Sequence, residues 1–137
     1  MRRPGRLLGA AFSVLAGAVA APTILRVAWS WPYRVAVAGH SMEPTLRDGD
    51  WLLVDPDAYR VRAPRPGELI VVPDPRAPGR VIVKRVALVD ADESLRVGGD
   101  HPAHASDVES IGALVPSAVI GRPWFRYWPL ERIGPIS

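Results

Sequence analysis

The sequence has no cysteine and only three histidines. The absence of cysteine excludes a disulfide framework, a thiolate zinc site and a thiol nucleophile. The histidines form no recognisable catalytic triad with the serines and aspartates around them. If the protein carries out covalent chemistry, a serine activated by a lysine is therefore the best machinery that its residues offer.

The sequence also lacks a strong charge of one sign. The formal net charge is +3, and the arginines are interleaved with valine, proline and aspartate rather than gathered with aromatic residues. This distribution argues against a nucleic-acid partner. The 137 residues suffice for one domain with a hydrophobic core, and fifteen prolines and twelve glycines favour short strands joined by turns.

One long apolar run is present, from Leu7 to Leu25, with nineteen residues and no charge. As a helix this run would span about 28 Å, close to the thickness of a bilayer core. A cleaved secretory signal, with a cleavage site at small residues such as Ala18 and Ala20, is the alternative. The run is longer than the apolar core of about 7–15 residues in most signal peptides, which favours a retained anchor.

Aromatic and basic residues flank this run. Trp29, Trp31 and Tyr33 follow it, where amphipathic rings settle at a membrane–water interface. Three arginines precede the run, and this excess favours an N-terminus inside and the remaining domain outside. We therefore expect residues 1–30 to form a basic region and a single-pass transmembrane helix, and residues 31–137 to form a β-rich domain on the extracytoplasmic side.

Short apolar runs bounded by turn residues fill the rest of the chain, which is typical of β-strands. The pattern predicts a mainly β, antiparallel domain of the folded-sheet or barrel-like kind. The expected strands cover residues 34–38, 51–54, 68–72, 80–89, 94–97 and 118–127, with exposed loops at 55–66 and 73–79. An acidic cluster, Asp48, Asp50, Asp55 and Asp57, is most simply a solvated loop, in which Asp50 could also hydrogen-bond the turn backbone.

Ser41 lies in a tight turn directly after one of the expected strands. Gly39 precedes it and Pro44 follows it, which suits a turn that presents a hydroxyl and directs backbone N–H groups at an oxyanion. His40 is not expected to act as its base, because adjacent residues on an extended chain point to opposite sides. For Ser41 in isolation, a serine that caps its own turn is the alternative.

Lys84 interrupts an otherwise apolar run at residues 81–86, within the longest β-branched run of the chain, residues 80–89. A lysine acts as a base only as the neutral amine, which requires its pKa to fall from about 10.4 by roughly three units. On a strand, Ile82, Lys84 and Val86 share one face, where burial would disfavour the charged form, whereas Arg85 points toward solvent or an opposing carboxylate. A charge that guards a strand edge is the alternative for Lys84 alone.

A set of short motifs in fixed order resembles that of the signal peptidase I family. Each motif alone is weak, but the order and spacing are specific, and the similarity covers about residues 35–130. The motifs are Gly-His-Ser-Met-Glu-Pro-Thr-Leu at 39–46, Gly-Asp at 49–50, Gly-Glu-Leu-Ile-Val-Val at 67–72, Val-Lys-Arg-Val at 83–86, Gly-Asp-His-Pro at 99–102, Gly-Arg at 121–122 and Trp-Pro at 128–129.

The resemblance implies a membrane-bound serine endopeptidase that removes an N-terminal leader from a precursor protein, with no metal or cofactor. Ser41 would be the nucleophile and Lys84 the general base. Met42 would seat the serine turn and Pro44 would shape it, and the Ser41 N–H would form the oxyanion hole, assisted from Gly39 or His40. Relatives favour small residues at the first and third positions before the scissile bond, and the expected subsite walls are Val35, Val37 and Val83.

The chain departs from the family pattern after residue 100. The family's Ser-x-Asp-Ser-Arg segment falls on residues 105–109, where Ala105 replaces the serine that helps to hold the lysine and Glu109 replaces the arginine of a bracing ion pair. Ser106 is one position away. The expected supporting residues are Arg85, Asp100, Ser106 and Asp107, and a catalytically weak relative is the alternative.

The short length and the ending at residues 121–129 resemble the maturation proteases of nickel-type superoxide dismutase. The expected partners are thus a membrane and a precursor with a leader, with the dismutase precursor as one candidate. A general signal peptidase I and a short relative of mitochondrial type are alternatives. A non-catalytic module that grips a precursor or delivers nickel through His101 and His104 is another, although His-x-x-His on a Gly/Pro loop lacks the fixed helical face that usually organises such ligands.

Overall fold

The computed structural model describes residues 33–104 and 111–137. The expected transmembrane anchor, Ser106 and Asp107 lie outside the described residues. The chain divides into two units after Trp31, and the second, Pro32–Ser137, holds the strands of the described part. Within the described ranges, no helix is both long and apolar enough to cross a bilayer.

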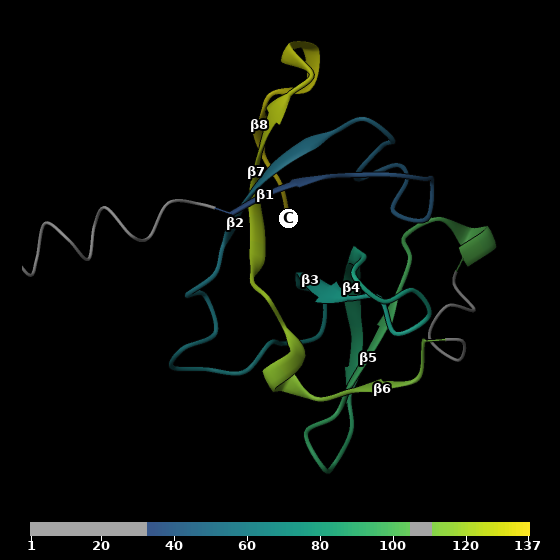
Figure 1. The fold of residues 1–137 in the computed structure, drawn as a ribbon, viewed down its shortest axis with the longest axis vertical. Coiled ribbons are helices and arrows are strands. Elements are labelled where there is room, and N and C mark those ends of the chain that lie inside the picture. The colour runs from purple at the N-terminus through teal and green to yellow at the C-terminus, as the bar shows by residue number, and fades with distance from the viewer. Residues whose placement is uncertain (1–32, 105–110) are drawn as a thin grey trace, which may run out of the picture. The chain divides into compact units, whose positions relative to one another are not determined.

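Two four-stranded antiparallel sheets make up this second unit (Figure 1). The first sheet has the order β1-β2-β7-β8, formed by Tyr33–Ala36, Trp51–Asp55, Arg122–Trp128 and Gly134–Pro135. The second has the order β3-β4-β5-β6, formed by Leu69–Pro73, Val81–Val89, Leu95–Gly98 and Ala113–Leu114. Three short 3-10 helices lie at η1 Pro102–His104, η2 Pro116–Ala118 and η3 Leu130–Arg132. The predicted antiparallel β domain is confirmed.

Strand β3 lies between two hydrophobic clusters and contributes alternate side chains to each. Leu69 and Val71 belong to one cluster, and Ile70 and Val72 belong to the other. Because successive side chains of a strand point to opposite faces, a strand covered on both sides reads as a continuous apolar run. This arrangement explains why residues 69–72 are all buried.

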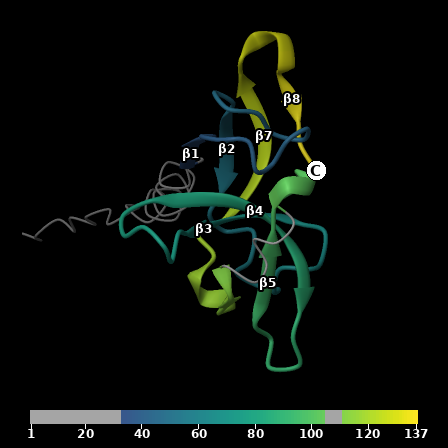
Figure 2. The same ribbon diagram turned by 90° about the vertical axis from the view of Figure 1, so that its right-hand side faces the viewer.

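Strand β4 pairs with different neighbours along its length. Residues 81–85 pair with β3, and residues 85–89 pair with β5. Figure 2 shows β4 and β5 running to a hairpin at one end of the domain, with β7 and β8 toward the other. Among the described residues, the 81–84 half of β4 therefore has a ladder partner on one side alone, and β1 likewise pairs only with β2.

The predicted strand at 118–127 is too long at its start. The structure has a 3-10 helix at Pro116–Ala118 and begins β7 at Arg122. Between them, Ile120 N–H donates to the Val71 carbonyl, and Val71 N–H donates to the Gly121 carbonyl, so this segment crosses from one sheet to the other. A Cβ at position 121 would lie 2.5 Å from the Asp55 carbonyl oxygen, so glycine is required for this approach.

Candidate active site

Ser41 and Lys84 line the same cavity, which has a volume of about 540 Å³. One wall is the edge of β1 and the chain that follows it, residues 35–42. The other wall is the half of β4 that pairs with β3 alone, residues 81–84, with Arg76, Gly79 and Arg80 from the preceding loop. The cavity therefore lies between two strand edges that belong to different sheets.

Lys84 is held by the apolar sheet around it. It lies opposite Ile70 in the β3–β4 ladder, and Ile70 is fully buried. Ile82 and Val86, two residues to either side, pack in the same cluster as Ile70. Lys84 is only 3% exposed, so its burial, predicted from the apolar run, is confirmed.

Ser41 lies in a compact turn between β1 and β2. Gly39 has φ +89°, a conformation that favours glycine, and the Glu43–Pro44 peptide is cis. The Leu46 N–H donates to the Met42 carbonyl at 2.9 Å, and both of these side chains are buried. Ser41 itself is half-buried and lines the cavity, next to the buried side chain of Met42.

The Gly39 amide makes a hydrogen bond within the segment between β1 and β2. Its N–H donates to Asp48 Oδ1 at 2.9 Å, so the donor is already engaged. Asp48 is exposed and follows Ser41 by seven residues, and its carboxylate accepts this hydrogen bond from the backbone of Gly39. This hydrogen bond supports the expected role of Gly39 in shaping the turn, and its contribution to an oxyanion hole stays a prediction.

Asp100 connects the serine turn to the lysine strand. Arg85 Nε and Nη2 donate to its two carboxylate oxygens, each at 2.8 Å, and Thr45 Oγ1 donates to it at 2.7 Å. Burial alone would raise the pKa of Asp100, but the hydrogen bonds from Arg85 and Thr45 outweigh burial and hold that pKa below its usual value. The expected pairing of Arg85 with a carboxylate is confirmed.

The residue after Asp100 contacts the backbone of Ser41 itself. The His101 N–H donates to the Ser41 carbonyl oxygen at 3.0 Å. The Gly-Asp-His-Pro motif thus contacts both segments that meet at the cavity, because Asp100 binds one residue next to Lys84 and one residue in the serine turn.

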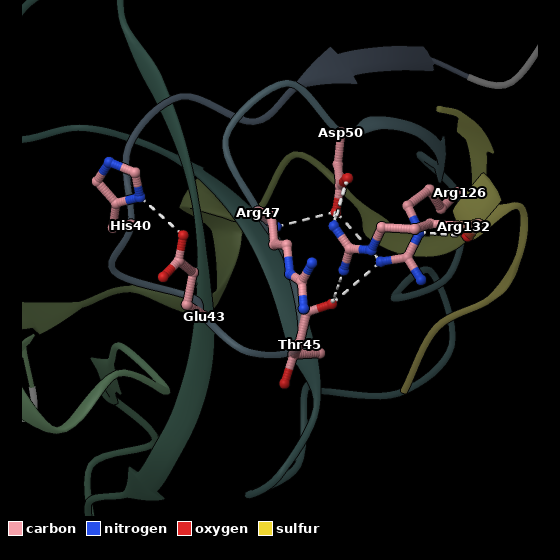
Figure 3. Close-up of polar contacts among 7 residues, drawn as sticks. All are labelled: His40, Glu43, Thr45, Arg47, Asp50, Arg126 and Arg132. Atoms are coloured by element: carbon pink, nitrogen blue, oxygen red, sulfur yellow. Dashed lines mark hydrogen bonds and ion pairs between the residues drawn. The ribbon is translucent and has the colours of Figure 1, made fainter. Parts of the chain in front are cut away.

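A buried carboxylate, Asp50, holds the serine turn from its other side (Figure 3). Asp50 is 1% exposed and accepts hydrogen bonds from Arg132 Nη1 at 2.8 Å and from Arg126 Nη1 at 3.1 Å. Both arginines also donate to the Thr45 carbonyl. The expected hydrogen bond to the turn backbone is confirmed by Arg47 N–H at 2.9 Å, but the prediction of a solvated loop is wrong for Asp50.

The His40 side chain contacts the Glu43 side chain. Its Nδ1 lies 2.7 Å from Glu43 Oε1, apart from the Asp50 cluster (Figure 3). The hydrogen bond and charge of Glu43 raise the pKa of His40, and the same contact lowers the pKa of Glu43. This pairing agrees with the expectation that His40 is not the base.

The structure brings most of the predicted site residues to one place. Five of them line the cavity: Gly39, His40, Ser41, Met42 and Lys84. Pro44 lines a shallow neighbouring pocket together with Glu43 and His101. The expected subsite walls, Val35, Val37 and Val83, also line the cavity.

Two ion-pair clusters near the site were not predicted from the sequence. One is Asp50 with Arg126 and Arg132. The other is Asp74 with Arg76 and Arg80, in a loop that was expected to be exposed, although Asp74 is only 3% exposed. Within 33–104 and 111–137, no group of three or more His, Asp or Glu side chains could hold a metal ion, and the His104 side chain lies outside the description.

Comparisons with known proteins define the family. The family described as signal peptidase, peptidase S26 matches residues 8–93, so the chain belongs to this family of peptidases. The mitochondrial inner membrane protease subunit 1 of Xenopus tropicalis is 27% identical over 152 aligned residues, which cover 96% of this chain and 91% of the relative. No solved structure matches.

Two other relatives are also inner membrane protease subunits of mitochondria. The mitochondrial ATP-independent inner membrane protease subunit 1b of Arabidopsis thaliana is 28% identical and covers 72% of each chain. The mitochondrial inner membrane protease subunit 2 of Danio rerio is 28% identical and covers 83% of this chain and 74% of its own length. The similarity thus extends over most of the chain to membrane proteases.

Proposed function

We propose that this protein is a membrane-anchored serine endopeptidase that removes an N-terminal leader from a precursor protein, with Ser41 as nucleophile and Lys84 as general base. The observation that carries this proposal is the shared cavity, which Ser41 and Lys84 line from two different sheets. Membership of the signal peptidase S26 family supports the reaction class.

The proposed reaction has two halves. The neutral amine of Lys84 accepts the proton of the Ser41 hydroxyl as its oxygen attacks the scissile carbonyl, and the same amine then protonates the departing amino group. A water molecule, activated by the amine, hydrolyses the resulting ester and releases the leader. The Ser41 N–H is the proposed donor to the oxyanion. Exclusion of solvent from Lys84, which is 3% exposed, supports this role.

An extended precursor segment fits the cavity best. The walls are the unpaired edges of β1 and of the 81–84 half of β4, and such edges bind a peptide through main-chain hydrogen bonds. Val35, Val37 and Val83 leave apolar surface between these edges, which suits small side chains near the scissile bond. This arrangement selects an unfolded leader junction over a folded protein surface.

The proposed setting is a bilayer surface. The run at residues 7–25 would anchor the domain, and the N-terminal arginines favour an extracytoplasmic site. The relatives of this chain are inner membrane proteases of mitochondria, which supports membrane association. The candidate precursors are a nickel-type superoxide dismutase with its leader and, alternatively, the precursors that a general signal peptidase processes.

The test is co-expression of the full chain with each candidate precursor, followed by mass spectrometry of the mature N-terminus. Wild-type protein should release one defined N-terminus, and Ser41→Ala and Lys84→Ala should each lower processing by at least about a thousandfold. Ser94→Ala is the matched control, because Ser94 lies in the β4–β5 turn outside the cavity. Processing that continues unchanged in Ser41→Ala contradicts the proposal.

A further inference from the structure

The loop between β3 and β4 is built around a buried carboxylate. The Asp74 side chain is fully buried, yet both of its oxygens are occupied by arginines. Arg76 donates to Oδ1 through its backbone N–H and its Nε, each at 3.0 Å, and Arg80 donates to Oδ2 through Nε at 2.9 Å and through Nη2. These contacts, with that of Arg76 the strongest, hold the pKa of Asp74 well below its usual value.

The two arginines line the same cavity as Ser41 and Lys84. Two arginines, Arg76 and Arg80, are among the lining residues, and no aspartate or glutamate is. Asp74 carries one negative charge and contacts two guanidinium groups. The Arg80 side chain remains 61% exposed although it is held by Asp74, so a ligand in the cavity can reach it.

The distance between this end and the nucleophile is set by β4. Val81 and Lys84 are three residues apart, and a strand advances about 3.3 Å per residue, so they are separated by about 10 Å. A peptide that runs extended along the same edge advances at the same rate. Arg80, which precedes Val81, therefore lies beside the peptide residue about four positions from the one at Lys84.

We propose that Arg80 and Arg76 form a subsite that binds a carboxylate side chain of the precursor, three to five residues from the scissile bond. The inference rests on the proposed function, since it places a peptide in the cavity. Asp74 acts as the positioning residue that fixes the two guanidinium groups. A guanidinium binds a carboxylate through two parallel hydrogen bonds, so the subsite selects an aspartate or a glutamate over a neutral side chain.

Binding tests the subsite without relying on turnover. The full chain carrying Ser41→Ala, in detergent, is titrated with fluorescent peptides that span a processed junction. Each peptide carries Asp, Asn or Lys at a single position, three to five residues before or after the scissile bond. We expect the Asp peptide to bind about fivefold more tightly than the Asn peptide at one of these positions, the Lys peptide to bind more weakly, and the difference to shrink as salt is added.

Variants assign the preference to the arginines. Arg80→Gln should reduce the Asp-over-Asn ratio to below about twofold, and Arg80→Lys should retain part of it. Arg76→Gln is measured in parallel, because Asp74 keeps one arginine partner in each single variant and the loop therefore keeps its shape. Arg60→Gln is the matched control, since Arg60 is exposed, pairs with Asp57 and lies outside the cavity.

Two outcomes overturn the subsite. The first is equal affinity for the Asp and Asn peptides at every position, and the second is a preference that survives both glutamine variants. Titration with phosphatidylglycerol vesicles covers the other anion source: if Arg80→Gln weakens vesicle binding and leaves the peptide preference unchanged, the arginines serve a lipid headgroup and the subsite is wrong. Cleavage of the unsubstituted junction peptide by wild-type protein is measured separately. Absence of this cleavage counts against the proposed function, whereas binding that does not depend on the charge of the peptide counts against the subsite.

Discussion

The segments that carry Ser41 and Lys84 meet at one cavity, yet different interactions hold them. The serine turn is surrounded by charged contacts: Asp50 with two arginines on one side, and Asp100 with Thr45 on the other. Lys84 lies in a strand whose neighbours are aliphatic, and its cross-strand partner Ile70 is fully buried. One half of the site is thus fixed by polar contacts to distant segments, and the other by apolar packing.

This difference shows how a small domain can place a buried amine beside a turn. The strand that carries Lys84 is positioned by its ladder with β3. A turn has few contacts of its own, so ion pairs and hydrogen bonds from Arg126 of β7 and Arg132 of η3 supply the missing constraints. Asp100 and Arg85 then couple the two halves.

Removal of the Asp50 carboxylate should have the largest effect on stability. In Asp50→Ala, the guanidinium groups of Arg126 and Arg132, which are 14% and 20% exposed, lose their carboxylate partner. Breaking a buried ion pair from one side costs about 3–5 kcal/mol of the free energy of unfolding. Urea denaturation measures this loss, with the exposed Asp57→Ala as control. A loss below about 1 kcal/mol would show that the serine turn does not depend on this cluster.

A smaller effect is expected from the apolar half. Ile70→Val removes one methyl group from the fully buried residue opposite Lys84, which should lower the free energy of unfolding by about 0.5–1.5 kcal/mol. Ile133→Val is the matched control, because Ile133 is 55% exposed. The same denaturation curves give both values, and an equal response of the two positions would contradict the packing account.

An effect that depends on pH is expected at Glu68, at the margin of the sheet that carries Lys84. The hydrogen bond from Arg62, with Arg65 N–H and nearby charges, outweighs burial and lowers the pKa of Glu68 from 4.5 to about 2. A folded pKa below the unfolded one means that the contribution to stability is present above about pH 4.5 and is lost as the pH falls toward about 2.

Thermal melts of wild-type protein and Glu68→Gln between pH 5 and pH 2 check this sign. The difference in melting temperature should be largest near pH 5 and should shrink as the pH falls, because protonation removes the ion pair from the wild-type protein. A difference that stays constant over this interval would show that Glu68 acts through its shape rather than its charge.

Local patterns in the sequence predict the elements of the site better than their connections. The strands and the burial of Lys84 follow from alternation and from β-branched residues near one another in the chain. Asp50 was misread because its partners lie 76 and 82 residues away, in a segment with no visible relation to the turn. Strands β6 and β8, with two residues each, are too short for any periodicity.

Asp74 shows a different reason for error. Its partners are only two and six residues away, but the surrounding Pro/Gly-rich segment is typical of an exposed loop. Nothing in that composition indicates that the loop closes around the carboxylate. Ser41 and Lys84 meet at one cavity because of how the two sheets pack. The family resemblance of the ordered motifs suggests this meeting, but the local pattern of residues around each of them does not predict it.

The proposed role of the Lys84 amine can be tested directly, because the chain has no cysteine. Lys84→Cys is aminoethylated in the unfolded state, checked by intact mass, refolded, and assayed for cleavage of a precursor beside the untreated variant and Lys84→Arg. The account predicts that aminoethylated Lys84→Cys regains cleavage, while untreated Lys84→Cys and Lys84→Arg stay inactive, since a guanidinium does not release its proton to become a base. Cleavage at the wild-type rate by untreated Lys84→Cys or by Lys84→Arg would contradict it.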